Sequence, residues 1–388
     1  MDSSLSPDQQ NIRDAILKHC SRFPDEYWLA RDRDGVFPHD FFQSLVESGW
    51  LGIAMPSEYG GSGLGITEAA VMMQAIAESG AAMSGASSVH IPVFSVQPVV
   101  LFGTPEQKQR ILPAVVSGKD RVCFAVTEPN AGLNTTEITT RAERRDGGYL
   151  VNGDKIWIST AQTANKMLLL ARTTPLDQVK KKTQGLSLFY TDLDRSKIEV
   201  RLIHKMGRHA VDSNMLFIQD LWVPEEDRIG AESDGFKILL HGLNPERVLV
   251  AAEAIGIGRA AIARASRYAR ERIVFGRPIG MNQGIAHPLA KCWAQLEAAN
   301  LMVMKAAALF DKGLDCGVEA NTAKYLAGEY AFEACHTAML TLGGMGYAQE
   351  YHVERLLREV LIPRVAPITP HMILNFIAEK VLDLPKSY

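Results

Sequence analysis

The hydrophobic pattern of this chain changes its period twice, and this change constrains the fold more than any other feature of the sequence. From Ser6 to about Lys119, apolar residues recur every three or four positions, which predicts helices. At Arg121 the period falls to about two and stays there to about Pro224, which predicts short strands. Helical spacing returns after Gly235. We therefore expect helices, then strands, then helices again.

This order predicts an α+β multidomain fold. The expected parts are an N-terminal α-helical domain (1–119), a middle antiparallel β domain (120–225) and a C-terminal α-helical domain of the four-helix bundle kind (226–388). A chain of 388 residues is long enough for two or three domains. Asp146-Gly147 and Asn152-Gly153 are typical hairpin turns, so we expect both to connect strands.

Charge and composition exclude several classes of protein. Lys and Arg number 41 against 44 Asp and Glu, a net charge of -3, without the basic excess typical of nucleic-acid binding. No nucleic-acid partner is expected. The ten histidines show no HExxH or paired spacing, so we expect no metal site. Five scattered cysteines without a CxxC pair predict reduced, mostly buried thiols: Cys20, Cys123, Cys292, Cys316 and Cys335.

The N-terminal residues open polar and acidic, without the features of a signal or transit peptide. No stretch approaches twenty apolar residues, so no membrane span is expected. These features predict a cytoplasmic protein, or one of the mitochondrial matrix if the source is eukaryotic.

Two strand ends in the middle domain carry groups suited to a flat heterocycle. "FAVTEPNAGLNTTE" (124–137) leaves a strand through Thr127 and enters a turn of small and hydroxyl residues. In "KIWIS", Trp157 and Ser159 alternate along a strand and should face the same side. An aromatic ring beside a hydroxyl donor would suit an isoalloxazine ring, although either segment alone is equally typical of an ordinary turn or a buried tryptophan.

Two further segments lie in the C-terminal part. "RYARERIVFGRPIGMNQG" ends a basic helix at Arg272, continues through Phe275, and opens the next helix at Gln283. An arginine at such a corner can hold a pyrophosphate by forked hydrogen bonds, or can simply neutralise the helix dipole. "LGGMGY" places Gly343 and Gly344 between helices, where a backbone can approach another group closely.

Taken in order, these four segments resemble motifs of the acyl-CoA dehydrogenase flavoprotein family, and the resemblance covers nearly the whole chain. "FAVTEPNAG" resembles the family's TEPxAGS, "GYLVNGDKIWIS" its YxLNGxKxWIT, "ERIVFGRPIGMNQ" its RxxFGxPIxxxQ, and "LGGMGY" its GGxGY.

The resemblance implies FAD as cofactor. Val126, Thr127 and Ser159 would contact the flavin ring, with Trp157 packed beside it. Thr369 would lie near the cofactor's phosphates. The FAD of a neighbouring subunit would be contacted by Arg272, Phe275, Gln283, Gly343 and Gly344. A homotetramer is therefore expected.

The sequence departs from the family pattern at four positions. Leu133 stands for a serine and Leu340 for a glutamine, so neither can donate a hydrogen bond. Ser159 stands for a threonine and keeps the hydroxyl. Pro367 stands where most of the family holds its proton-abstracting glutamate, so no carboxylate is available there.

By the same resemblance, a minority branch carries this base on the first long helix of the C-terminal domain, where this chain has Glu246. We expect Asn244 to cap that helix and Pro245 to occupy its first turn, which would leave Glu246 at an N-terminus. Asn244 and Arg247 are expected to contact the substrate. The alternative is a structural glutamate paired with Arg247 or Lys237.

The expected reaction is α,β-desaturation of an acyl-CoA to the trans-2-enoyl-CoA, with electrons passed to an electron-transferring flavoprotein. The segments 88–103 and just before Glu246 are expected to form the pocket wall, and the placement of the base favours branched or longer acyl groups. Alternatives are an oxidase or another flavin enzyme of the same fold. A non-catalytic acyl-CoA-binding subunit is a further alternative, consistent with Leu133 and Pro367.

Overall fold

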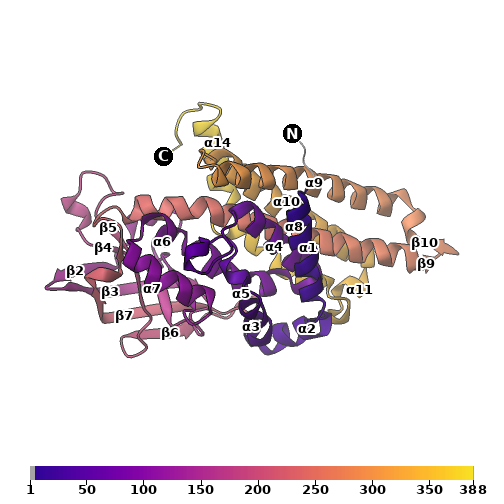
Figure 1. Cartoon of the computed structure of the whole chain (residues 1–388). Coiled ribbons are helices and arrows are strands. Elements are labelled where there is room, and N and C mark those ends of the chain that lie inside the picture. The colour runs from indigo at the N-terminus through magenta and orange to yellow at the C-terminus, as the bar shows by residue number, and fades with distance from the viewer. Residues whose placement is uncertain (1–4, 388) are drawn as a thin grey trace.

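The fold is seen in a computed structural model that describes residues 5–387 (Figure 1). Its N-terminal part is helical, and two helices begin with a capping box. Ser6 Oγ accepts a hydrogen bond from the Gln9 amide, and Thr104 Oγ1 accepts one from the Gln107 amide, each 3.2 Å long. The helices are α1 (Pro7–Cys20), α2 (Asp25–Asp34), α3 (His39–Glu47), α4 (Ile66–Ile76), α5 (Ala82–Ser95), α6 (Gln97–Phe102) and α7 (Pro105–Val116).

The middle part is an eight-stranded sheet in the order β6-β7-β3-β2-β4-β5-β8, with β1 paired to β4. The β1–β4 and β2–β4 pairs are parallel and the others are antiparallel. The strands are β1 (Val122–Ala125), β2 (Arg141–Arg145), β3 (Gly148–Ser159), β4 (Lys166–Arg172), β5 (Leu186–Asp192), β6 (Ile198–Leu202), β7 (Ser213–Pro224) and β8 (Arg228–Ile229). Leu168 packs in one core cluster and Met167 in another, so both faces of β4 are covered.

One of the two predicted hairpin turns is wrong. Asp146-Gly147 does connect β2 to β3, but Asn152-Gly153 lies inside the twelve-residue β3. The strand register shifts there, because β7 holds one more residue than β3 between neighbouring pairs. Gly153 is required for close approach, since a Cβ at this position would lie 2.5 Å from Thr140 Oγ1.

The C-terminal part is built on three long helices, α8 (Gly235–Glu271), α9 (Gln283–Asp311) and α10 (Gly317–Leu342). Buried alanines such as Ala299 and Ala327 allow these helices to pack closely. The remaining elements are β9 (Ile273–Val274), β10 (Arg277–Pro278), α11 (Gly344–Tyr347), α12 (Val353–Glu359), α13 (Ile362–Val365) and α14 (Pro370–Lys380).

Figure 1 shows the sheet at one end of the molecule and the β9–β10 hairpin at the other, with α8 running between them. The N-terminal helices α4 and α5 pack against α8 and share one core with the long C-terminal helices. The five cysteines named above are free and buried, as expected.

The expectation that no segment approaches a membrane span is wrong by length and hydropathy alone. Within residues 5–387, two segments meet both criteria, Ile66–Phe102 and Val353–Lys380. The most apolar window of the first is 83% buried in the core, whereas that of the second is 17% buried. The second segment is divided into α12, α13 and α14 and includes Arg355 and Glu359.

Candidate active site

Glu246 lies inside α8, not at its N-terminus. The helix begins at Gly235, so Pro245 is an interior residue and the predicted cap at Asn244 is wrong. Apolar residues before position 244 extend the helix, because Ile238 and Leu239 are buried against the core. The Asn244 side chain instead accepts a hydrogen bond of 2.8 Å from Arg247 Nη1.

The Glu246 carboxylate is poised between its charged and neutral forms. Its Oε2 atom is buried and has no hydrogen-bond partner among residues 5–387. Burial raises the pKa of Glu246 to about 7, while the neighbouring charges of His90 and Arg247 oppose this rise. A carboxylate with a pKa near neutrality and no structural partner has the properties of a general base.

A buried histidine–glutamate pair lies near this carboxylate. His90 Nδ1 of α5 is 2.8 Å from Glu253 Oε1 of α8, and both side chains are almost fully buried. Burial alone would lower the pKa of His90, but the Glu253 carboxylate, with a smaller contribution from Glu246, raises it above its usual value. His90 belongs to the 88–103 segment that the sequence places in the pocket wall.

Ser159 ends β3 and accepts a hydrogen bond of 2.9 Å from Arg208 Nη2. The charge of Arg208 also influences His90, and His90 influences Glu246.

Val126 and Thr127 follow β1, as predicted, and a buried ion pair fixes the turn after them. Lys155 Nζ donates to the Val126 carbonyl at 3.0 Å and to Glu128 Oε1 at 2.9 Å. Glu128 in turn accepts from the Thr140 amide at 2.9 Å. The expected flavin-side turn therefore has a rigid internal support.

Trp157 does not follow the simple alternation on which its predicted orientation rests. β3 holds one extra residue between Lys155 and Ile158, and Trp157 adopts a positive φ of 62°. Its side chain is 55% exposed, so the indole ring is available to contact another molecule. Ser159 beyond it is half-buried.

Thr369 caps α14 and lies in a segment held by a buried lysine. Lys324 Nζ of α10 donates to the carbonyls of Arg364, at 3.4 Å, and of Ile368. Burial lowers the pKa of Lys324 to about 8, and its charge also acts on Glu246. The segment before Pro370 is thus anchored to α10 through Lys324.

The other predicted cofactor residues lie far from Glu246. Arg272 follows α8, and 26 residues at 1.5 Å each place it about 39 Å along the helix from Glu246. Arg272, Gln283 and Phe275 are exposed, and Phe275 is 100% exposed at the tip of the β9–β10 hairpin. One subunit therefore cannot place this group and Glu246 around the same part of a cofactor.

Gly343 and Gly344 connect α10 to α11 and are exposed. A Cβ at either position would meet nothing within 4 Å in the described part of the chain, so their backbone is open to another molecule. Gly343 also has a φ of 60° with a ψ of -133°, a conformation accessible essentially to glycine alone. Leu133 and Leu340, the departures from the family pattern, are both exposed.

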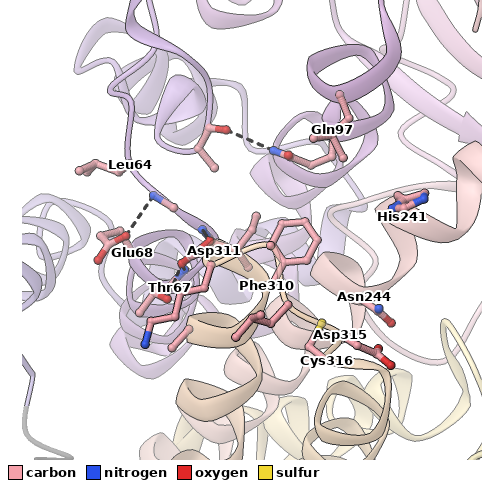
Figure 2. A pocket seen from close by; sticks show the side chains of 18 of the residues that line it. Leu64, Thr67, Glu68, Gln97, His241, Asn244, Phe310, Asp311, Asp315 and Cys316 are labelled. Carbon is pink, nitrogen blue, oxygen red and sulfur yellow. Dashed lines mark hydrogen bonds between the residues drawn. The ribbon is translucent and has the colours of Figure 1, made fainter.

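A cavity of about 1130 Å³ opens on another face of α8 (Figure 2). The segments 88–103 and before Glu246 both line it, through Gln97, Leu101, Leu240, His241 and Asn244. Their role as the wall of a substrate pocket beside Glu246 stays a prediction. Glu246 is not among its lining residues; it follows Asn244 by two positions, which is about 200° around a helix. The cavity brings Asn244 together with Asp311, Asp315 and Cys316, but not with Glu246.

Arg208, Lys324 and the pairing of His90 with Glu253 were not predicted from the sequence. Arg208 lies in the loop between β6 and β7, and Lys324 lies in an Ala-rich helix, so neither belongs to a recognisable motif. The one available signal was Glu253 itself, a charged residue seven positions after Glu246 on a predominantly apolar helix face. Among residues 5–387 no group of three or more His, Cys, Asp or Glu side chains could hold a metal ion.

Comparison with known proteins decides the family. The chain matches models of the N-terminal, middle and C-terminal domains of acyl-CoA dehydrogenase over residues 6–119, 123–221 and 233–382. It is 36% identical over 390 aligned residues to the acyl-CoA dehydrogenase FadE12 of Mycobacterium tuberculosis, covering 99% of this chain and 98% of that protein. The chain belongs to the acyl-CoA dehydrogenase family.

Two further members of the family are informative. CarC of Acetobacterium woodii, a subunit of a caffeyl-CoA reductase–Etf complex, is 33% identical over 84% of this chain and 86% of its own. The structure of butyryl-CoA dehydrogenase from Megasphaera elsdenii superimposes with a TM-score of 0.93 at 30% identity, covering 98% of this chain and 100% of that one. This acyl-CoA dehydrogenase family member is accordingly an oxidoreductase with the fold predicted from its sequence.

The residues present fit the FAD that this family uses. In the described part of the chain, the proton of the Ser159 hydroxyl has no hydrogen-bond acceptor. Trp157 has an exposed ring, and the backbone of Gly343 and Gly344 faces open space. A free hydroxyl proton and an exposed aromatic ring suit a planar group, and an open glycine backbone suits the close approach of another molecule.

Proposed function

We propose that this protein is an FAD-dependent acyl-CoA dehydrogenase that converts an acyl-CoA to the trans-2-enoyl-CoA with Glu246 as the catalytic base. The observation that carries this proposal is the unpartnered, buried Oε2 of Glu246 in a carboxyl group whose pKa is raised to about 7. The alternative of a structural glutamate is disfavoured, because Arg247 bonds to Asn244 rather than to Glu246.

Glu246 removes the α-proton of the thioester and keeps it on its carboxyl group. FAD, when bound, supplies the acceptor for the β-hydrogen, which leaves as hydride. Val126, Thr127 and Ser159 hold the flavin ring and Trp157 packs beside it. Thr369 contacts the cofactor near its phosphates, and Arg247 and Asn244 contact the acyl-CoA.

A neighbouring copy completes the cofactor site. Arg272, Phe275, Gln283, Gly343 and Gly344 reach the FAD of that copy in a homotetramer. The distance of about 39 Å along α8 supports this arrangement, since Arg272 lies too far from Glu246 to contact the same part of a cofactor in one subunit. Large exposed side chains at this end, Phe275, Met281 and Trp293, are suited to burial in such an interface.

Electrons pass from the protein to an electron-transferring flavoprotein. The relative CarC is a subunit of a caffeyl-CoA reductase–Etf complex, which supports an electron-transferring flavoprotein as the redox partner. The bacterial source of the relatives supports a cytoplasmic location. We further propose that the substrate carries a branched or longer acyl group, because the base lies on the first long helix of the C-terminal part and not at position 367.

Anaerobic mixing of the FAD-loaded protein with a ladder of straight and branched acyl-CoAs tests the function. Bleaching of the flavin absorbance with formation of the 2-enoyl-CoA supports it. Binding of acyl-CoA without bleaching would instead identify a non-catalytic binding subunit. Rapid reoxidation by dioxygen, and not by an electron-transferring flavoprotein, would identify an oxidase.

A further inference from the structure

Arg208 connects three serine hydroxyls that come from three different elements. Its guanidinium donates to Ser159 Oγ at the end of β3 (2.9 Å), to Ser213 Oγ at the start of β7 (3.0 Å) and to Ser87 Oγ of α5 (3.3 Å). The backbone of Arg208 has a φ of 54°, which is unfavourable for a residue with a Cβ. The surrounding hydrogen bonds therefore hold this side chain in one defined position.

The partners of this guanidinium are neutral. In the part of the chain that the structure describes, the contacts of the Arg208 guanidinium are to serine hydroxyls and not to a carboxylate, and its buried Nε atom has no hydrogen-bond partner there. Burial lowers the pKa of Arg208, and the more distant carboxylates of Glu359, Asp212 and Glu253 oppose that shift. An arginine remains protonated in proteins, so a positive charge stands directly beside Ser159.

This hydrogen bond determines which way the Ser159 hydroxyl can point. A guanidinium only donates, so Ser159 Oγ must accept from Arg208, and its own proton must point elsewhere. Within residues 5–387 no acceptor for that proton is found. The serine is thus left with one proton available to a molecule that the protein binds.

We propose that Arg208 is a positioning residue that orients the Ser159 hydroxyl as a hydrogen-bond donor to the flavin. The inference rests on the proposed function, because it takes the flavin to lie against Ser159. Ser159 stands where the family pattern has a threonine. Serine lacks the methyl group that restricts the rotation of a threonine side chain, so its hydroxyl depends more on a neighbouring group for its orientation. Arg208 acts through Ser159 and touches no reacting atom.

The test is a double-mutant cycle read by the midpoint potential and absorption spectrum of the bound flavin, measured without substrate. Arg208→Met, Ser159→Ala and the double variant are compared with the wild-type holoenzyme. A donor to the flavin stabilises its reduced form, so either single change should lower the midpoint potential. If Arg208 acts through Ser159, the Arg208→Met shift should be largely absent in the Ser159→Ala background. Arg201→Met, at an exposed arginine paired with Glu199, should leave the potential unchanged.

Equal shifts from Arg208→Met in both backgrounds, or no shift in either, would overturn the proposal. If Arg208→Met does not fold, Arg208→Ala replaces it in the same cycle, because it also removes the donor to Ser159 Oγ, and the same comparison of backgrounds decides. Failure of the proposed function is recognised separately, because the wild-type protein would then hold no flavin or show no bleaching by any acyl-CoA.

Discussion

Lys155 Nζ lies 2.9 Å from Glu128 Oε1, and both side chains are buried between β3 and the turn that follows β1. Burial lowers the pKa of Lys155 to about 8, and the Glu128 carboxylate limits this fall. The same ammonium donates to the carbonyls of Val126 and Leu170 at 3.0 and 2.8 Å. This ion pair therefore joins the expected flavin-side turn to the interior of the sheet.

Lys155→Met should destabilise the protein by about 3–5 kcal/mol, because it leaves Glu128 as a buried charge without its partner. The double variant Lys155→Met/Glu128→Gln should recover part of this loss. Urea unfolding measures both effects. Lys182→Met is the matched control, since Lys182 forms an exposed ion pair with Glu137 that should contribute no more than about 1 kcal/mol. Equal stability of the two lysine variants would contradict a structural role for the buried pair.

Arg272→Ala should weaken FAD binding in the assembled protein. Loss of a charge-assisted contact to phosphate costs about 1.5–3 kcal/mol, which corresponds to roughly a 10- to 150-fold weaker affinity. Flavin retained after dialysis measures the effect, and sedimentation should show that the tetramer persists. Arg267→Ala, at an exposed position of the same helix, should retain flavin normally. Unchanged flavin content in Arg272→Ala, or an FAD-replete monomer of the wild type, would contradict the shared site.

The helix ends show what local sequence can and cannot predict. Ser6 and Thr104 cap their helices, and such capping depends on only a few neighbouring residues. Asn244-Pro245 has the same local signature, yet it lies inside α8 because buried residues such as Ile238 extend the helix across it. Asn152-Gly153 fails as a hairpin for a similar reason, since pairing with β7 outweighs its turn propensity.

The candidate site likewise contains residues that local sequence identifies and residues that it does not. Glu246 and Ser159 were identified because each lies in a motif that can be read along the chain. Arg208, by contrast, reaches Ser159 across 49 positions, and His90 reaches Glu253 across more than 160. Such contacts depend on how the three parts pack, which no local pattern of residues specifies. The boundaries proposed for these parts, and the roles assigned to the site residues, remain predictions.

The pH dependence of turnover should reflect Glu246. A base acts in its deprotonated form, so kcat/KM should rise with pH through about 7, where burial places the pKa of this carboxyl group. The groups whose charges act on it are His90 of α5, Arg247 and Glu253 of α8, and Lys324 of α10. His90→Gln removes the positive charge that lowers the pKa, so it should move this limb to higher pH. A flat profile between about pH 6 and 8 would contradict an assignment of Glu246 as the base.

Glu246 is the residue on which the proposed reaction depends most, and Glu246→Gln tests its role most directly. Glutamine keeps the shape and most of the packing of the side chain but cannot accept the α-proton. The variant should fold, retain FAD and bind acyl-CoA, while anaerobic flavin bleaching by a saturating acyl-CoA slows by at least about 10²–10⁴-fold. Bleaching at a rate near that of the wild type would show that another group takes the proton, and would contradict the assignment of Glu246 as the catalytic base.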